Sequence, residues 1–374
     1  MNIVGPKAYI HLDRVKKNLL NIYKKVGRRH LLCVVKADGY GHGSKSISAA
    51  ISNMSGISFA VFAFEEALEL RESGITNEIL IFSRIQKEWL ELCYKLSLTV
   101  SVSSMNDLNL LIEMHNLFGK CPRFHLKFDT GMTRLGFDLE DSSLVFKLIN
   151  DIKSMPLDGI FTHFATSDEE DLSYAHKQLQ SFQQVVKNGQ DFGLYFKYIH
   201  CSNSGAVLNL PDAYFNMVRI GILLYGAAPS KDVSMHVEVE PVMSFCGPIV
   251  NIRRVKAGTQ VSYGGVYKTK KDTNIAVVQT GFADGFPRPW YENGFVSYKG
   301  VEYKIAGRAC MDQFMVDFGD VEPEEGDEVL IFGKRNLDNI PIERIASEIG
   351  TTAYALFTAI KGRTEYIKLD PTPI

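Results

Sequence analysis

The sequence lacks the features that mark several classes of protein. Its 6 cysteines are scattered, without the close pairs of a zinc site or the clustering of a disulfide-rich secreted chain. No apolar run approaches the length of a bilayer span, and the first residues, MNIVGPK, lack the pattern of a signal peptide. The 41 basic and 43 acidic residues are well mixed and give a net charge of -2, so no basic stripe points to nucleic acid or anionic membranes. We therefore expect a cytoplasmic protein with reduced thiols, no metal site, and no nucleic-acid or membrane partner.

The first two thirds of the sequence alternates regularly between strand-like and helix-like segments. Eight apolar runs of strand length are separated by segments of helix length. This order is typical of a (β/α)8 TIM barrel, an α/β fold, and the chain is long enough to form one. The expected strands cover residues 31–36, 58–62, 78–82, 98–102, 124–128, 157–162, 195–200 and 215–218. The expected helices cover residues 13–26, 44–54, 64–73, 86–96, 104–117, 139–153, 170–188 and 204–208.

The pattern changes near Glu240 and Pro241. From there on, glycine and proline punctuate short β-rich runs, with one expected helix over 341–349. We expect a barrel over residues 11–240 followed by a mostly-β domain over 241–374, with no linker between them. The expected strands of the second domain cover residues 242–245, 249–255, 275–279, 295–298, 314–318 and 328–331.

Barrel enzymes carry their functional side chains at the carboxyl ends of the strands. The first expected strand ends in Lys36, where desolvation of a charge is costly. Either the strand surfaces into solvent there, or the lysine lies in a shielded site, loses its proton and becomes a nucleophile. The other polar or small residues that follow the strands are Tyr40, Arg134, His163, Asn203, Ser204, Gly205, Arg219, Gly221 and Ile222.

These residues would suit one particular cofactor. Loops after the last two strands of a barrel commonly bind phosphate through backbone N–H groups, and Ser204 and Gly221 fit such a cradle. A barrel would hold pyridoxal phosphate with the phosphate on one side of its mouth and a lysine across from it. The cofactor's aldehyde would then form a Schiff base with Lys36.

Each of these residues also has an ordinary structural interpretation. Arg134 and Arg219 could be salt-bridge partners, and His163 could be a core histidine whose hydrogen bonds are satisfied. Asn203 and Ser204 could simply cap a helix. Because all of them fall at one end of one predicted barrel, we favour the functional interpretation.

The motifs of the sequence resemble those of the alanine racemase family. The similarity starts at the lysine motif VKADGYGHG (35–43) and continues into the β-rich part. Motifs in the family's order cover nearly the whole chain, which makes the resemblance specific. They are KFDTGMTRLG (127–136), FTHFA (161–165), VRIGI (218–222), VSYG (261–264), GFADG (281–285), GRACMDQ (307–313) and Tyr354.

The resemblance implies a pyridoxal-phosphate enzyme that interconverts L-alanine and D-alanine and supplies D-alanine for cell-wall peptidoglycan. It also implies a head-to-tail homodimer in which each β domain completes the partner's active site, with residues 1–10 pairing with that domain. It assigns catalysis to Lys36 and Tyr263, the substrate carboxylate to Arg134 and the backbone of Met311, and the entryway to Asp168, Phe282 and Arg308. It assigns the cofactor to Lys36, Tyr40, His163, Asn203, Ser204, Arg219, Gly221, Ile222 and Tyr354.

These residue types suit a two-base reaction. Racemisation requires a base on each face of a planar carbanion, and the resemblance places Lys36 on one face and Tyr263 on the other. A free tyrosine has a pKa of about 10, so Tyr263 requires activation, for which Arg134 is the natural agent. Arg219 cannot transfer a full proton to the pyridine nitrogen, which disfavours transamination. In the fold-related decarboxylases the resemblance would lead one to expect a glutamate there.

Three features leave alternatives open. Lys127 matches a lysine that is carbamylated in some relatives and holds the substrate-binding arginine, but an ordinary lysine–aspartate pair is equally consistent. Phe282 stands where the family usually has an entryway tyrosine, and KGRTEY (361–366) departs from the usual Arg-Val-Pro-Arg.

Two other classes of function are disfavoured. A related decarboxylase would need a cysteine-and-aspartate motif that the β-rich part lacks, and a cofactor carrier would lack the domain that bears Tyr263.

Overall fold

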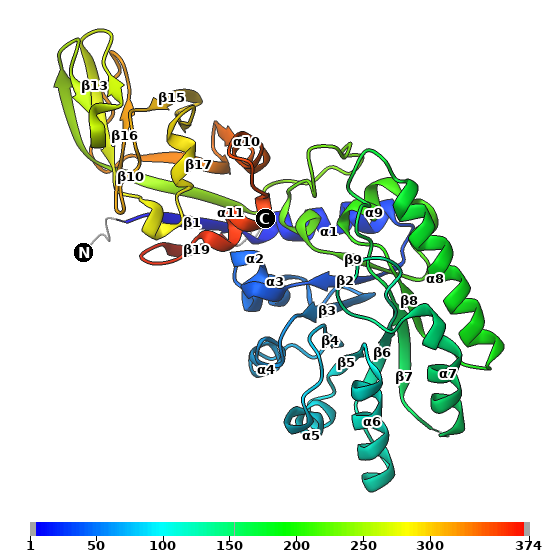
Figure 1. The fold of residues 1–374 in the computed structure, drawn as a ribbon. Helices are drawn as coiled ribbons and strands as arrows, with labels where there is room; N and C mark the ends of the chain where they lie inside the picture. Colours follow the sequence, from blue (N-terminus) through cyan, green and yellow to red (C-terminus); the bar gives the residue numbers. More distant parts are fainter. Residues whose placement is uncertain (1–4, 153, 370–374) are drawn as a thin grey trace.

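The computed structural model describes residues 5–152 and 154–369. The chain folds into a barrel, drawn from blue to green in Figure 1, and a β-rich domain, drawn from yellow to red. Three parts of the expected elements lie outside the described residues. They are residues 1–4 of the expected N-terminal strand, residues 370–374 of the expected β domain, and the last residue of the expected helix 139–153. Within the described ranges, no helix is both long and apolar enough to cross a membrane.

The barrel confirms the predicted (β/α)8 fold. Eight parallel strands form one sheet in the order β8-β7-β6-β5-β4-β3-β2-β9, so each strand follows its sequence neighbour until β9 returns beside β2. The backbone N–H of Arg219 in β9 donates to the carbonyl of Ser202 just after β8, at 3.1 Å, which links the two ends of the sheet. The strands are β2 (His30–Val34), β3 (Ile57–Val61), β4 (Ile79–Ile81), β5 (Thr99–Val102), β6 (Arg123–Lys127), β7 (Leu157–Phe161), β8 (Tyr198–His200) and β9 (Met217–Ile220).

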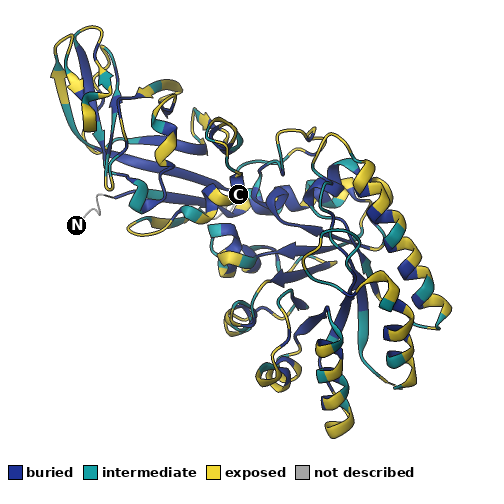
Figure 2. Ribbon diagram, in the orientation of Figure 1, coloured by how far each residue is buried: buried dark blue, intermediate teal, exposed yellow. Residues whose placement is uncertain are grey.

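Helices surround the barrel and bury one face against it, as the burial colours of Figure 2 show. Local chemistry sets their ends. The helix α6 begins after Ser104, whose hydroxyl accepts from the Asp107 N–H, and it ends at Gly119, which has a φ of 67°. The barrel helices are α1 (Leu12–Lys25), α3 (Ser44–Ile51), α4 (Phe64–Glu72), α5 (Lys87–Lys95), α6 (Met105–Phe118), α7 (Ser142–Asp151), α8 (Ser173–Asp191) and α9 (Ser204–Asn209).

The second domain is built on a nine-stranded sheet in the order β18-β17-β14-β15-β16-β13-β10-β1-β19, with β17 also pairing with β10. The N-terminal strand β1 lies in this sheet between β10 and β19, and the chain then enters the barrel through α1. The strands of the sheet are β1 (Lys7–His11), β10 (Met243–Val255), β13 (Thr273–Val278), β14 (Phe295–Tyr298), β15 (Val301–Ile305), β16 (Phe314–Asp317), β17 (Glu328–Arg335), β18 (Asp338–Ile340) and β19 (Glu365–Leu369). A hairpin of β11 (Gln260–Val261) and β12 (Tyr267–Lys268) and the helices α10 (Ile342–Glu348) and α11 (Ala353–Ala359) complete it.

One expectation for this domain is wrong. The predicted strands 242–245 and 249–255 are a single strand, β10, although Gly247 and Pro248 interrupt its pattern. The strand changes partners there, from β1 and β17 before the proline to β13 after it, with register shifts on both sides. Pro248 is the last residue of β10 that pairs with β17, so its missing N–H falls where one ladder ends and the next begins.

The turn after β2 has an unusual backbone. Ala37, Asp38, Gly39, Tyr40 and Gly41 all have positive φ values, between 50° and 77°, so the segment α2 (Lys36–Gly41) is a left-handed turn. Each non-glycine residue in this conformation is destabilised by roughly 1–2 kcal/mol. The carboxylate of Asp38 accepts from the Ser44 N–H at 2.8 Å and holds the turn against α3. The strained turn fixes the backbone that carries Lys36.

Gly41 joins this turn to α11 of the β domain. It has a φ of 77°, and a Cβ added to it would lie 2.5 Å from the Phe357 carbonyl oxygen. Gly74 is a matched control, because its φ is 91° but nothing lies within 4 Å of an added Cβ. We expect Gly74→Ala to cost about 1 kcal/mol from backbone strain alone and Gly41→Ala to cost clearly more. Thermal unfolding midpoints test this, and equal shifts for the two variants would contradict the close packing of Gly41.

Candidate active site

A cavity of about 940 Å3 opens at the carboxyl ends of the barrel strands. Most residues predicted from the sequence line it. They come from the carboxyl-terminal parts of five strands and the loops that follow them, and from α11 of the β domain. The α11 helix packs against the turn that follows β2. The predicted residues that line the cavity are Lys36, Tyr40, Lys127, Arg134, His163, Asp168, Asn203, Ser204, Arg219, Gly221, Ile222 and Tyr354.

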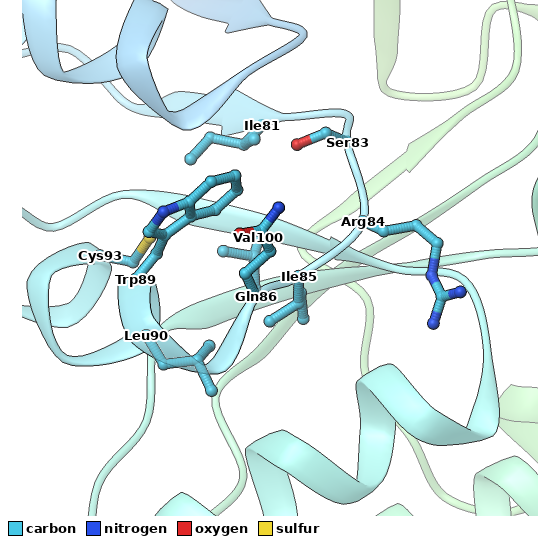
Figure 3. A pocket seen from close by; sticks show the side chains of 9 residues that line it. All are labelled: Ile81, Ser83, Arg84, Ile85, Gln86, Trp89, Leu90, Cys93 and Val100. Carbon is cyan, nitrogen blue, oxygen red and sulfur yellow. The ribbon is translucent and has the colours of Figure 1, made fainter.

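A second cavity, between α5 and the strands β4 and β5, has the wrong size and lining for a substrate site. Figure 3 shows Trp89, Cys93 and Val100 around it. Its free volume of about 10 Å3 holds one water at most. The cavity at the barrel mouth, which the predicted residues line, is the candidate active site.

Lys36 lies in this cavity rather than on an open surface. Burial lowers the pKa of Lys36, and the nearby charge of Arg134 lowers it further. Glu66 has the opposite, smaller effect on this pKa. The Glu66 carboxylate also accepts from the Ala37 N–H at 2.6 Å, directly after the lysine. The environment thus favours a neutral amine on a fixed backbone, as a nucleophile or base requires.

Arg219 is 3% exposed and donates to the protein through both Nη atoms. Nη1 bonds the His200 Nδ1 at 3.0 Å, and Nη2 bonds the His163 Nδ1 at 3.0 Å and the carbonyls of Thr162 and Cys201 at 2.9 and 3.0 Å. No described carboxylate forms an ion pair with Arg219, so the salt-bridge interpretation does not hold. Burial lowers the pKa of Arg219 to about 10, which leaves it charged at neutral pH. Its Nε–H remains as a donor for a ligand.

The part of the cavity beside the ends of β2, β8 and β9 is rich in hydroxyl and N–H groups. The Ser204 hydroxyl accepts from the Gly221 N–H at 3.1 Å, and the rings of Tyr40 and Tyr354 lie 5.8 Å apart. A Cβ at Gly221 would lie 2.6 Å from the Tyr40 hydroxyl oxygen, so only glycine permits this approach. Ile222, the next residue, is fully buried. Hydroxyls beside a backbone that approaches closely suit a phosphate group.

Asn203 has a different role from its neighbours. Its side-chain oxygen accepts from the Ala206 N–H at 3.0 Å and from the Ser167 hydroxyl at 2.7 Å. The side chain therefore caps α9, as the structural interpretation of the sequence allowed. Asn203 lines the cavity, but its amide oxygen is engaged with the protein.

Positive charge exceeds negative charge in this cavity. Lys127 is 8% exposed, and burial, together with the charges of Arg134 and Arg219, lowers its pKa to about 8. The Asp129 carboxylate accepts from backbone N–H groups of its own loop, and no ion pair with Lys127 forms among the described residues. Asp168 is the carboxyl group in the lining, and burial raises its pKa. The cavity is therefore suited to anionic ligands.

The remaining predicted residues lie on the β domain, outside the cavity. Tyr263 is 68% exposed and Met311 is 57% exposed. The hydroxyl of Ser262, next to Tyr263, donates to the Arg308 carbonyl at 2.6 Å. The Phe282 N–H donates to the carbonyl of Cys310, beside Met311, at 3.3 Å. The structure thus forms two groups, one inside the barrel mouth and one exposed on the β domain.

Sequence reasoning missed two residues that support this site, Glu66 and His200. His200 is the last residue of an expected strand, which is the position that singled out Lys36 and His163, so the same rule could have found it. Glu66 offered a weaker signal, as an acidic residue in the first turn of an expected helix.

Comparison with known proteins agrees with this geometry. The family model described as alanine racemase, N-terminal domain, matches residues 10–229, and the one described as alanine racemase, C-terminal domain, matches residues 242–368. An alanine racemase of Desulforamulus reducens is 35% identical over 95% of this chain and 96% of its own length. One of Methanococcus maripaludis is 36% identical over 97% of this chain and 98% of its own length.

Solved structures give the same result. A structure of alanine racemase from Clostridium difficile 630 has a TM-score of 0.89 and 35% identity, and the match covers 98% of this chain and 97% of that one. One from Streptomyces coelicolor has a TM-score of 0.90 and 30% identity, and covers 99% of both chains. The chain belongs to the alanine racemase family.

Proposed function

We propose that this protein interconverts L-alanine and D-alanine with pyridoxal phosphate as its cofactor and two bases, Lys36 and Tyr263. The observation that carries the proposal is the separation of these two side chains. Lys36 lines the barrel cavity, whereas Tyr263 is exposed on the β domain of the same chain. A head-to-tail homodimer would bring the partner's Tyr263 to the cavity, and each site would then be shared between two chains.

The residues of the cavity fit pyridoxal phosphate. Lys36 would hold its aldehyde end, and Tyr40, Ser204, Tyr354 and the N–H of Ile222 would hold its phosphate. Gly221 would support them through its N–H, which donates to the Ser204 hydroxyl. Arg219 would direct its Nε–H to the ring nitrogen, with His163 beside the ring. The side chain of Asn203 would support this arrangement through the cap of α9 rather than by a direct contact. When bound, the cofactor supplies the electron withdrawal that acidifies the α-hydrogen of the amino acid.

Each proposed base would act on one face of the substrate. Lys36, whose pKa is lowered by burial, would take or return a proton at Nζ on its own face. The partner's Tyr263 would do the same at its hydroxyl oxygen on the other face. Because Arg219 is protonated and cannot give up its proton, it would donate a hydrogen bond without protonating the ring nitrogen. This limit on electron withdrawal would disfavour transamination.

The substrate would be held by its carboxylate and admitted past three residues. Arg134, a cavity residue without an ion pair among the described residues, would bind the carboxylate together with the backbone of the partner's Met311. Asp168 and, from the β domain, Phe282 and Arg308 would line the entryway. Phe282 lacks a hydroxyl, and its ring centroid lies 5.6 Å from the Arg288 guanidinium carbon.

We place the activity in the cytoplasm, where D-alanine would be supplied for peptidoglycan.

The shared site predicts complementation between two inactive variants. Lys36→Ala and Tyr263→Phe should each reduce the rate of D-alanine formation from L-alanine by about 100-fold or more. After unfolding and refolding of an equal mixture, half of the dimers would carry one intact site, so about a quarter of the wild-type activity should return. A chiral assay of alanine before and after mixing measures this.

The control is each variant refolded alone, which should stay inactive. Tyr263→Phe should still retain pyridoxal phosphate at Lys36, detected as a borohydride-stable label on the peptide that contains it. If the mixture recovers no activity although wild-type protein survives the same treatment, the shared site is refuted. If wild-type protein forms no D-alanine at all, the proposed reaction itself is refuted.

Carbamylation of Lys127 gives a separate prediction. Carbon dioxide adds to a neutral amine, with loss of a proton, and the low pKa of Lys127, about 8, makes that form available near neutral pH. The carbamate would place a negative charge beside Arg134. We expect a carbamate signal in the carbon NMR spectrum with 13C-bicarbonate, stronger as the pH rises through 8. The signal should be absent in Lys127→Met but present in Lys177→Met, a surface control; its persistence in Lys127→Met would contradict the assignment.

A further inference from the structure

Two buried histidines continue the hydrogen bonds of Arg219 into the barrel interior. The Arg219 Nη1 lies 3.0 Å from the His200 Nδ1, and the His200 Nε2 lies 2.9 Å from the His125 Nδ1. The three side chains come from β9, β8 and β6, and their exposed fractions are 3%, 0% and 4%. His125 is not in the lining of the cavity, so it would reach a ligand there only through the other two residues.

The chemistry of arginine fixes the direction of every bond in this chain. A guanidinium group only donates, so the His200 Nδ1 must accept and carries no proton. A neutral His200 then carries its proton on Nε2 and donates it to the His125 Nδ1. Burial lowers the pKa of His125 to about 3 and that of His200 well below its usual value, so both rings are neutral at physiological pH.

The packing around both rings preserves this arrangement. Phe161 stacks on His200 with ring centroids 4.9 Å apart and an interplanar angle of 4°. Gly159 leaves room for His125, because a Cβ there would lie 2.9 Å from the Nδ1 and Cε1 atoms of that ring.

We propose that His125 is a positioning residue for Arg219. The His125 Nδ1 accepts from the His200 Nε2–H and so keeps His200 in the tautomer with a free Nδ1. That Nδ1 accepts from Arg219, and this bond holds the guanidinium with its Nε–H toward the cavity. In the other tautomer, the His200 Nδ1–H would face an N–H of Arg219, and the two donors would repel each other. The effect on catalysis rests on the proposed function, in which Arg219 faces the cofactor's ring nitrogen. The tautomer of His200 does not depend on that function.

Nitrogen NMR of 15N-histidine protein without cofactor tests the tautomer directly. The His200 signal, assigned with His200→Gln, should report the Nε2–H form at pH 7 in the wild-type protein. His125→Leu removes the acceptor and should give a mixture of tautomers or a loss of the Nε2–H form. His125→Asn keeps an acceptor near the Nδ1 position and should preserve the wild-type signal, as should His176→Asn, an exposed control. An Nδ1–H or charged His200 in the wild-type protein, or no change in His125→Leu, would overturn the proposal.

Kinetics of the loaded enzyme then separate positioning from packing. His125→Leu should lower kcat for alanine racemisation by roughly 10- to 100-fold with little change in KM. It should also raise the pyruvate released per turnover, since alanine that transfers its amino group to pyridoxal phosphate leaves as pyruvate and forms pyridoxamine phosphate. His125→Asn should restore both values. Equal losses in the two variants, with pyruvate unchanged, would leave only a packing role and overturn the proposal.

Two further measures keep the test decisive. If His125→Leu does not fold, the wild-type protein still decides, because an Nδ1–H or charged His200 there would overturn the proposal. If the wild-type protein fails to racemise alanine, the proposed function fails, while the NMR result still decides whether His125 sets the tautomer of His200.

Discussion

A guanidinium group that is buried with no carboxylate partner among the described residues organises the mouth of this barrel. The sheet begins at β8 and ends at β9, and Arg219 joins these ends through its backbone N–H and through bonds to His200 and Cys201. Its Nη2, which bonds Cys201, also reaches the Thr162 carbonyl after β7. The same residue therefore joins the two ends of the barrel sheet and lines the cavity. Because arginine stays protonated even at a lowered pKa, this closure also fixes one positive charge in the site.

The rest of the site follows from that charge and from the division of the chain into two domains. Lys36, Lys127 and Arg134 add further positive groups to a cavity that contains little negative charge, so anionic ligands balance it. The strained turn after β2 holds Lys36 in place and packs through Gly41 against α11, so the two domains of one chain are joined beside the site. Tyr263, in contrast, lies exposed on the β domain, away from its own cavity. In the proposed reaction, a second chain supplies the second base.

The sequence predicted the parts of the structure that depend on local pattern. Apolar periodicity located the barrel strands, and the rule that chemistry follows the carboxyl ends of strands placed Lys36, His163 and Arg219 around one cavity. Prediction from the sequence failed where contacts between distant segments determine the structure. β10 continues through Pro248 because its partners change there, and His125 meets His200 only because β6 and β8 both flank β7. The left-handed turn depends on contacts with α3, α4 and α11, which no local signal contains.

The measurement that tests the central claim most directly is the fate of the α-hydrogen when L-alanine reacts in heavy water during a single turnover. Two bases on opposite faces predict that D-alanine, as it first forms, carries solvent deuterium while the remaining L-alanine keeps its original hydrogen, because the base that removes a proton is not the base that returns one. D-alanine that retains the substrate hydrogen, or exchange into L-alanine without any D-alanine, would contradict a site built from Lys36 of one chain and Tyr263 of another.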